Sequence, residues 1–204
     1  MRRDKASARR RYNGVAPASK PRLILFCHAD IFIAGFCGRR GRGGLARRVD
    51  VFHIVLYEPE IPQNTGNIMR LCANQGSTLH LVEPLGFVLS SAKARRAGLD
   101  YGEFARVALH PDWERLQEAL PDSRFFALTS KGETRFDEPR FEPGDAFVFG
   151  PESRGLPDDI LARFDPSRRL RIPMMPRARC MNLSNSAAVM AYAAWSQFGY
   201  EGGS

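Results

Sequence analysis

The sequence lacks several features that would point directly to a class of protein. No stretch reaches the roughly 18 uninterrupted apolar residues that a membrane-spanning helix needs. No GxGxxG follows the first expected strand and no GxxxxGK(S/T) occurs, which disfavours the usual dinucleotide and triphosphate sites. The four cysteines and four histidines show no CxxC pair and no metal-ligand spacing. We therefore expect no membrane span, no metal and no disulfide framework, in a protein of the cytoplasm.

The positive charge is confined to one part of the chain. The formal net charge is +8 over 204 residues, but residues 1–50 carry a net of +10 and residues 51–204 a net of −2. The overall basic balance therefore says little about the larger part. We predict two regions: a basic N-terminal extension, 1–50, and a single folded domain, 51–204.

The extension has more than one interpretation. Its basic start and the apolar run Leu23–Cys37 suggest a signal peptide, but His28 and Asp30 interrupt that run. The Arg/Gly tract 38–44 would suit a disordered RNA-binding arm. We favour a dispensable, disordered extension, or a wrongly assigned start with true initiation at a valine codon just before the first strand.

Strands and helices alternate after residue 50. Short apolar runs predict strands at Val51–Tyr57, Thr78–Val82, Phe104–Leu109, Phe125–Leu128, Ala146–Phe149 and Leu170–Ile172. Helical spacing, caps and breakers predict helices at Thr65–Gln75, Ala92–Ala97, Pro111–Ala119, Asp158–Phe164 and Ser184–Phe198. This alternation predicts an α/β fold, a parallel sheet with helices on both faces.

Three unusual segments follow the predicted strands. They are 58–70 (EPEIPQNTGNIMR), 150–157 (GPESRGLP), and 172–174 (IPM) leading into 181–186 (MNLSNS). In open parallel sheets, ligands bind beyond the carboxyl ends of the strands. The sequence therefore predicts a functional site built from these three segments.

The segments resemble the motifs of the SPOUT (knotted) RNA methyltransferases. LYEPEIPQNTGNIMRLCAN, RRAGLDY, FGPESRGLP and MNLSNSAAV stand in the order and spacing of that family, from Phe52 to Tyr200. The match is closest to the bacterial branch that methylates the ribose of the wobble nucleotide of tRNA. The resemblance implies a SPOUT fold with a C-terminal deep trefoil knot and a homodimer. It also implies an S-adenosyl-L-methionine-dependent enzyme acting on the 2′-hydroxyl of cytidine or uridine 34.

By resemblance, Arg70 and Glu152 are the catalytic candidates. An arginine binds phosphate bidentately and is a poor base unless its pKa is heavily lowered, so we expect Arg70 to position the reacting ribose. Glu152 would order Arg70 or the following turn. Capping of that turn is the simpler structural alternative for Glu152.

The resemblance also implies a set of cofactor-binding residues, namely Leu128, Gly150, Ile172, Cys180, Met181 and Leu183. Gly150 has no side chain and would let backbone approach the ligand closely. From the sequence alone, Leu128 and Ile172 are equally typical of plain core. Relatives commonly carry serine at the position of Cys180, and a thiol is the weaker hydrogen-bonding group.

The RNA-binding candidates are Asn64, Arg154, Arg177 and Tyr192. Asn64 could instead cap or begin a helix. Two basic groups, Lys93–Arg96 and Arg168–Arg179, could hold the RNA backbone or be solvated surface.

The final helix carries small and aromatic residues on one broad face: Ala187, Ala188, Ala191, Ala194, Trp195 and Phe198. This face could meet a partner subunit or pack into the core. Two other functions remain open, a 2′-O-methyltransferase of another RNA site and a non-catalytic RNA-binding protein.

Overall fold

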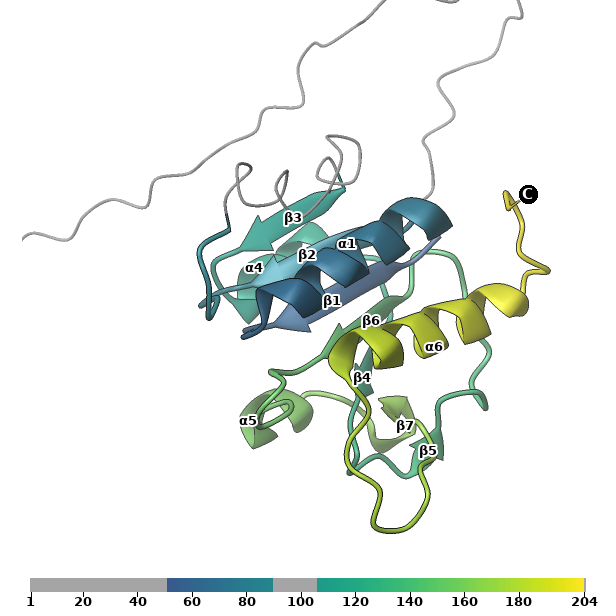
Figure 1. The fold of residues 1–204 in the computed structure, drawn as a ribbon. Coiled ribbons are helices and arrows are strands. Elements are labelled where there is room, and N and C mark those ends of the chain that lie inside the picture. Colours follow the sequence, from purple (N-terminus) through teal and green to yellow (C-terminus); the bar gives the residue numbers. More distant parts are fainter. Residues whose placement is uncertain (1–50, 90–105, 204) are drawn as a thin grey trace, which may run out of the picture. The chain divides into compact units, whose positions relative to one another are not determined.

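The structure is a computed structural model that describes residues 51–89 and 106–203. Within these residues the strands form one parallel sheet in the order β3-β2-β1-β6-β4-β7-β5 (Figure 1). The strands are β1 (His53–Tyr57), β2 (Thr78–Val82), β3 (Val107–His110), β4 (Phe125–Leu128), β5 (Thr134–Arg135), β6 (Ala146–Phe149) and β7 (Arg169–Arg171). The helices are α1 (Pro62–Gln75), α4 (Trp113–Ala119), α5 (Asp158–Leu161), the 3-10 helix η1 (Pro166–Arg168) and α6 (Leu183–Ser196).

Helices cover both faces of the sheet, as predicted. On one face, α1 and α6 lie side by side over a core that includes Phe52, Leu56 and Phe147 (Figure 1). On the other face, residues of α4 and α5 pack with Val55 and Val148. The alternation of strand residues between two buried clusters explains why these strands are apolar throughout.

Helix α1 begins earlier than its periodicity predicts, because Pro62 occupies its first turn, where a missing amide hydrogen costs nothing. It ends at Gly76, whose φ of 81° is the left-handed conformation that favours glycine. The buried side chain of Gln75 donates to the carbonyl of Ala191 at 2.7 Å and so joins α1 to α6.

The small-residue face of α6 packs inside its own chain. Ala187, Ala191, Ala194 and Trp195 are buried in the cluster shared with α1. Core packing therefore accounts for this face. The large apolar side chains of α6 that remain exposed lie elsewhere, at Val189 and Tyr192, which are 38% and 42% exposed.

Strand β7 lies between β4 and β5, although the chain joins β4 to β5 directly through residues 129–133. Thr129 donates its amide to the carbonyl of Leu170, and Phe136 donates to that of Arg171. Gly132 lies against β7 so closely that an added Cβ would stand 2.5 Å from the carbonyl oxygen of Arg169. Strand β5 was not predicted, because two residues carry no periodicity.

A row of three histidines crosses the sheet, one from each of β1, β2 and β3. Nδ1 of His53 lies 3.0 Å from Nε2 of His80, and Nδ1 of His80 lies 2.9 Å from Nε2 of His110. Burial, and then the two neighbouring rings, lower the pKa of His80 to about 2. Burial also lowers the pKa of His110, against a smaller opposing effect of Asp112. We call these residues the histidine row.

Several predicted features lie outside the described residues: the extension 1–50, the helix Ala92–Ala97 and the basic group of Lys93, Arg95 and Arg96. Within the described ranges, no helix is both long and apolar enough to cross a membrane. The same ranges hold no group of three or more His, Cys, Asp or Glu side chains that could bind a metal ion.

Candidate active site

The predicted site residues on the strands come together at one edge of the sheet. Leu128, the last residue of β4, pairs with Phe149, the last residue of β6, so Leu128 and Gly150 are neighbours. Leu128 also pairs with Leu170 of β7, and Ile172 directly follows that strand. Three cofactor candidates thus stand at the carboxyl ends of three adjacent strands, where parallel sheets bind ligands.

Glu152 ties the second motif to the first. Its carboxylate accepts hydrogen bonds from the amides of Glu60 and Ile61, at 2.8 and 3.2 Å, and from the side-chain amide of Asn64 at 2.9 Å. Ile61 is the N-cap residue of α1, and its side chain makes no capping hydrogen bond. Glu152 therefore places a negative charge at the amino end of α1, which the helix dipole favours. It orders the helix that carries Arg70, rather than capping the turn after it.

Asn64 ties the third motif to the first two. Its oxygen accepts from the side-chain amide of Asn182 at 3.0 Å, while its own amide donates to Glu152. The oxygen of Asn182 in turn accepts from the amide of Ser184 at 2.9 Å, which caps α6. We call Glu152, Asn64 and Asn182 the edge network, since together they join all three motifs.

Burial limits what Asn64 can contact. The residue is only 5% exposed, and its side chain bonds to the chain on both sides. The RNA contact predicted for Asn64 therefore has little surface on which to form. Its role as an N-cap is also excluded, because Ile61, three residues earlier, occupies the N-cap position of α1.

A second set of contacts closes the same corner on its exposed side. The amide and hydroxyl of Ser153 donate to the carboxylate of Glu60 at 2.9 and 2.8 Å, which lowers the pKa of Glu60. Arg154 forms an ion pair with Glu58, so the guanidinium predicted to bind RNA has a partner within the chain. More than half of the Arg154 side chain remains exposed.

Gly150 is required by the fold itself. A Cβ built there would lie 2.2 Å from the amide nitrogen of Leu156 and 2.3 Å from the carbonyl carbon of Gly155. The close approach predicted for this position is thus made by the chain's own backbone as 150–156 turns back on itself.

The segment 173–181 has polar backbone groups that the described chain does not use. Within the described residues its one backbone hydrogen bond runs from the amide of Ala178 to the carbonyl of Met175. Cys180, Met181 and the RNA candidate Arg177 are exposed in this segment. Leu183, at the start of α6, is half-buried and packs on the core. The segment, which follows the end of β7 in the chain, offers donors, acceptors and apolar side chains.

The two remaining candidates lie on the helices. Arg70 is exposed on α1, six residues beyond Asn64, or about 9 Å along the axis. Tyr192 is exposed on α6 and contacts the ring of Trp195, with centroids 5.7 Å apart. The edge network fixes the amino ends of both helices, and through them the positions of these side chains.

Three residues of this corner are not among the predicted site residues. The capping role of Asn182 could be read from its place before α6, but not its bond to Asn64, 118 residues away. Glu60 and Ser153 meet across 93 residues. The only sequence feature that could have pointed to their contact is that they belong to two motifs that follow neighbouring strands.

The chain is similar to a known protein family, to named relatives and to solved structures. The model of the SpoU rRNA Methylase family matches residues 51–192. A tRNA (cytidine(34)-2′-O)-methyltransferase of Methylovorus glucosotrophus is 57% identical over 74% of this chain and 99% of its own length. The Escherichia coli protein of the same name is 51% identical over 74% and 97%. A structure described as "Structural insights into the 2-OH methylation of C/U34 on tRNA" has a TM-score of 0.67 and 49% identity, covering 72% of this chain and 96% of that one.

Proposed function

The chain belongs to the SpoU rRNA methylase family, and on that premise we propose that it methylates the ribose 2′-hydroxyl of nucleotide 34, the wobble position, of tRNA. The relatives that support this target are named for that reaction and align along nearly their whole length. The observation that carries the proposal is the edge network, which brings the three motif segments together at the carboxyl edge of the sheet. The reaction belongs in the cytoplasm, together with its tRNA substrate.

S-adenosyl-L-methionine is the methyl donor in this proposal. The residues fit such a group, because the segment 173–181 has backbone donors and acceptors not used within the described chain, and the half-buried Leu128 and Leu183 supply apolar side chains. Leu128, Gly150, Ile172, Cys180, Met181 and Leu183 would hold it. When bound, it supplies a methyl group already activated by its sulfonium charge.

The chain's own task is to bring a ribose oxygen into line and stabilise its developing charge. Arg70 holds the phosphate next to that ribose, since a guanidinium binds phosphate in a fixed, forked geometry. Glu152 acts on the amino end of α1 and is thus a positioning residue. Arg154, Arg177 and Tyr192 are the further RNA contacts, and Arg154 must exchange its bond to Glu58 for one to RNA.

We also propose a homodimer and a trefoil knot. The exposed apolar side chains of Val189 and Tyr192 on α6 support a partner surface there. The insertion of β7 between β4 and β5, beneath the connection 129–133, supports a knotted path. Sedimentation velocity tests the dimer, and a sedimentation coefficient of a monomer at micromolar concentration contradicts it. Pulling the unfolded chain by its ends tests the knot. A knotted chain stretches to less than its full contour length.

The decisive experiment combines labelled cofactor with unmodified tRNA and maps the methylated nucleoside by mass spectrometry. We expect 2′-O-methylation at nucleotide 34, with rRNA fragments as the alternative substrate. In Arg70→Ala we expect a loss of roughly 10²-fold or more in rate, because ribose positioning is lost, while calorimetry shows unchanged binding of S-adenosylhomocysteine. Methylation elsewhere, or cofactor binding without any transfer to RNA, would refute the assignment, and an active Arg70→Ala would remove Arg70 from the site.

A further inference from the structure

The cations of the described domain differ in whether a carboxylate pairs with them. Six of its basic side chains are already in ion pairs with carboxylates: Arg115 with Glu118, Arg124 with Asp145 and Glu142, Lys131 with Asp158, Arg135 with Asp137, Arg154 with Glu58 and Arg163 with Glu114. An arginine in such a pair must exchange a carboxylate for a phosphate when RNA binds. Its net contribution to RNA affinity is therefore small.

A second group has no carboxylate partner within residues 51–89 and 106–203. Its members are Arg140, Arg168, Arg171, Arg177 and Arg179, and all five are exposed. Arg169 is a different case, because its guanidinium donates to the carbonyl of Phe164 at 2.8 and 3.0 Å and stays in place. The unpaired arginines are the cations that can bind a polyanion at full strength.

Four of these five arginines follow one line through the fold. Arg168 ends η1, at the amino end of β7, and Arg171 ends β7 at the opposite edge of the sheet. Arg177 and Arg179 follow in the segment proposed to contact cofactor and RNA. The line therefore runs from the candidate active site across the sheet to its amino edge.

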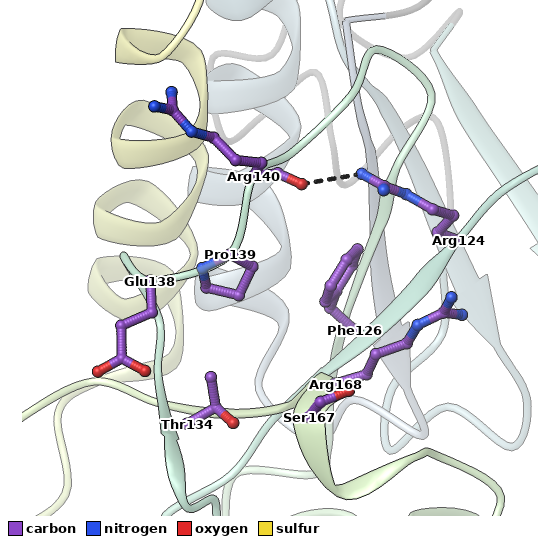
Figure 2. Close-up of a pocket in the computed structure, with 8 residues that line it drawn as sticks. All are labelled: Arg124, Phe126, Thr134, Glu138, Pro139, Arg140, Ser167 and Arg168. Carbon is purple, nitrogen blue, oxygen red and sulfur yellow. Dashed lines mark hydrogen bonds between the residues drawn. The ribbon is translucent and has the colours of Figure 1, made fainter.

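A hollow of about 350 Å³ lies at the far end of this line (Figure 2). Arg168 and Arg140 line it, together with the hydroxyl-bearing Thr134 and Ser167. The hydroxyl of Ser167 is already engaged, since it donates to Asp165 at 2.6 Å. Among the eight lining residues Glu138 is the only acid, and it lies 3.8 Å from Arg135.

The ring of Phe126, which lines the hollow, positions the guanidinium of Arg168. The guanidinium of Arg168 lies 5.8 Å from the ring centre of Phe126, and that of Arg124 lies 5.6 Å from the same ring (Figure 2). Arg124 is occupied by Asp145, Glu142 and the carbonyl of Arg140. Arg168 is oriented by the aromatic ring and keeps its hydrogen-bond donors for a ligand.

We propose that this hollow is a second binding site for the RNA, a subsite that takes a backbone phosphate on Arg168, with Thr134 beside it; the Arg140 side chain points away from Arg168 (Figure 2) and would have to turn toward the hollow to add a second cation. It lies at the far end of an arginine track formed by Arg171, Arg177 and Arg179, which leads from the transfer site. This inference rests on the proposed function. A domain of net charge −2 over residues 51–204 binds a polyanion most strongly where cations have no carboxylate partner, as in the arginines of this track.

The test compares two double variants of the full-length protein. Arg140→Ala with Arg168→Ala removes two unpaired arginines of the hollow. Arg115→Ala with Arg163→Ala removes two exposed arginines that are ion-paired, on the side of the sheet covered by α4 and α5. Measured for each are the KM and kcat with tRNA, the salt dependence of the Kd for tRNA, and the Kd for S-adenosylhomocysteine.

For the double variant Arg140→Ala with Arg168→Ala, called the hollow variant, we expect the Kd and KM for tRNA to rise about tenfold. The kcat should stay nearly unchanged. The slope of log Kd against log salt should fall by about 1 to 2, because each phosphate that the protein no longer neutralises lowers the slope by about 1. The paired-arginine control should stay within about twofold of wild type. Arg168→Lys should restore most of the salt slope but less of the affinity, since lysine keeps the charge and loses the fork.

Two outcomes overturn the subsite while leaving the methyltransferase intact. One is an active hollow variant with unchanged KM and salt slope. The other is equal weakening in both double variants, which would mean that net charge alone matters. A wild-type protein that binds S-adenosylhomocysteine yet methylates no tRNA refutes the proposed function instead, so the two failures are distinguishable.

Discussion

The edge network and the histidine row are both built from polar side chains, yet they differ in what they connect. The histidine row joins adjacent strands of the same sheet, across 27 and 30 residues. The edge network joins segments 88 and 118 residues apart and fixes the amino ends of α1 and α6. The first network serves the sheet, whereas the second brings the three motifs into one site.

The networks also differ in their response to protons. The side chains of Asn64 and Asn182 are amides, which do not titrate near neutral pH. The rings of His80 and His110 remain neutral in the folded protein because burial disfavours their charged forms. We therefore expect damage to the edge network to reduce catalysis, and damage to the histidine row to alter stability against acid.

Among changes to these two networks, the largest effect should come from Asn64→Ala. Removing this amide leaves Glu152 and Asn182 without their common partner, so α1 and α6 lose their shared anchor. We expect kcat/KM to fall by roughly 10²-fold, as a displacement of about 1 Å can cause. Steady-state methylation of tRNA measures the loss.

Asn74→Ala is the matched control, since Asn74 is an exposed asparagine on the same helix. It should leave kcat/KM within about twofold of wild type. If Asn64→Ala were as active as Asn74→Ala, the edge network would have no catalytic role and the contrast with the histidine row would fail.

An intermediate effect should appear on acidification. His80 has a folded pKa of about 2, below its ordinary value of 6.5, so the unfolded chain binds a proton that the folded chain does not. The stability that this group contributes is complete above about pH 6.5 and is lost as the pH falls toward 2. We expect the free energy of unfolding to drop on the order of 1 kcal/mol per pH unit from this residue. Urea titrations at pH 7.5, 6.0 and 5.0 measure the drop.

His80→Gln sharpens that prediction, because glutamine can donate and accept but cannot gain a charge. The test compares how steeply the unfolding free energy of the two proteins changes between pH 6.0 and 5.0. If the substitution lowers stability by the same amount at every pH, this slope is unaffected. The slope should be smaller than in wild type, whereas kcat at pH 7.5 should stay within about twofold. An unchanged slope would show that other groups cause the acid sensitivity.

The smallest effect should come from Cys180→Ser, which exchanges a thiol for a hydroxyl, the stronger hydrogen-bonding group. The side chain is exposed, and the segment around it offers mainly backbone groups to a ligand. We expect the Kd for S-adenosylhomocysteine to change by less than about threefold, as measured by calorimetry. A change of tenfold or more would show that the cofactor binds the side chain at this position rather than the backbone.

Local patterns in the sequence predicted much of the fold. Thr78–Val82, Phe125–Leu128 and Ala146–Phe149 are strands with the predicted bounds, since each is a short apolar run closed by a polar residue or glycine. The helices on both faces followed from the alternation of elements. The strand order did not follow, because β7 pairs with a strand more than 40 residues earlier, and no local pattern encodes such a pairing.

The site was predicted as three segments, but not as a network. Motif resemblance brought Glu152 into the site, whereas its bonds to the amides of Glu60 and Ile61 depend on how β1 and β6 pair. Gly150 shows the same limit. Its lack of a side chain suggested space for a ligand, and only the path of Gly155 and Leu156 shows what fills that space.

The position of β7 between β4 and β5 has a consequence for synthesis on the ribosome. A chain made as far as residue 165 already contains β1 to β6, but the gap between β4 and β5 is still without its strand. Unpaired strand edges are sites of wrong association, so the nascent chain is vulnerable until Arg169–Arg171 has emerged. The segment 173–181 and α6, which carry other residues proposed to hold the methyl donor, follow β7 in the chain. The sheet can therefore be completed before the proposed cofactor site is assembled.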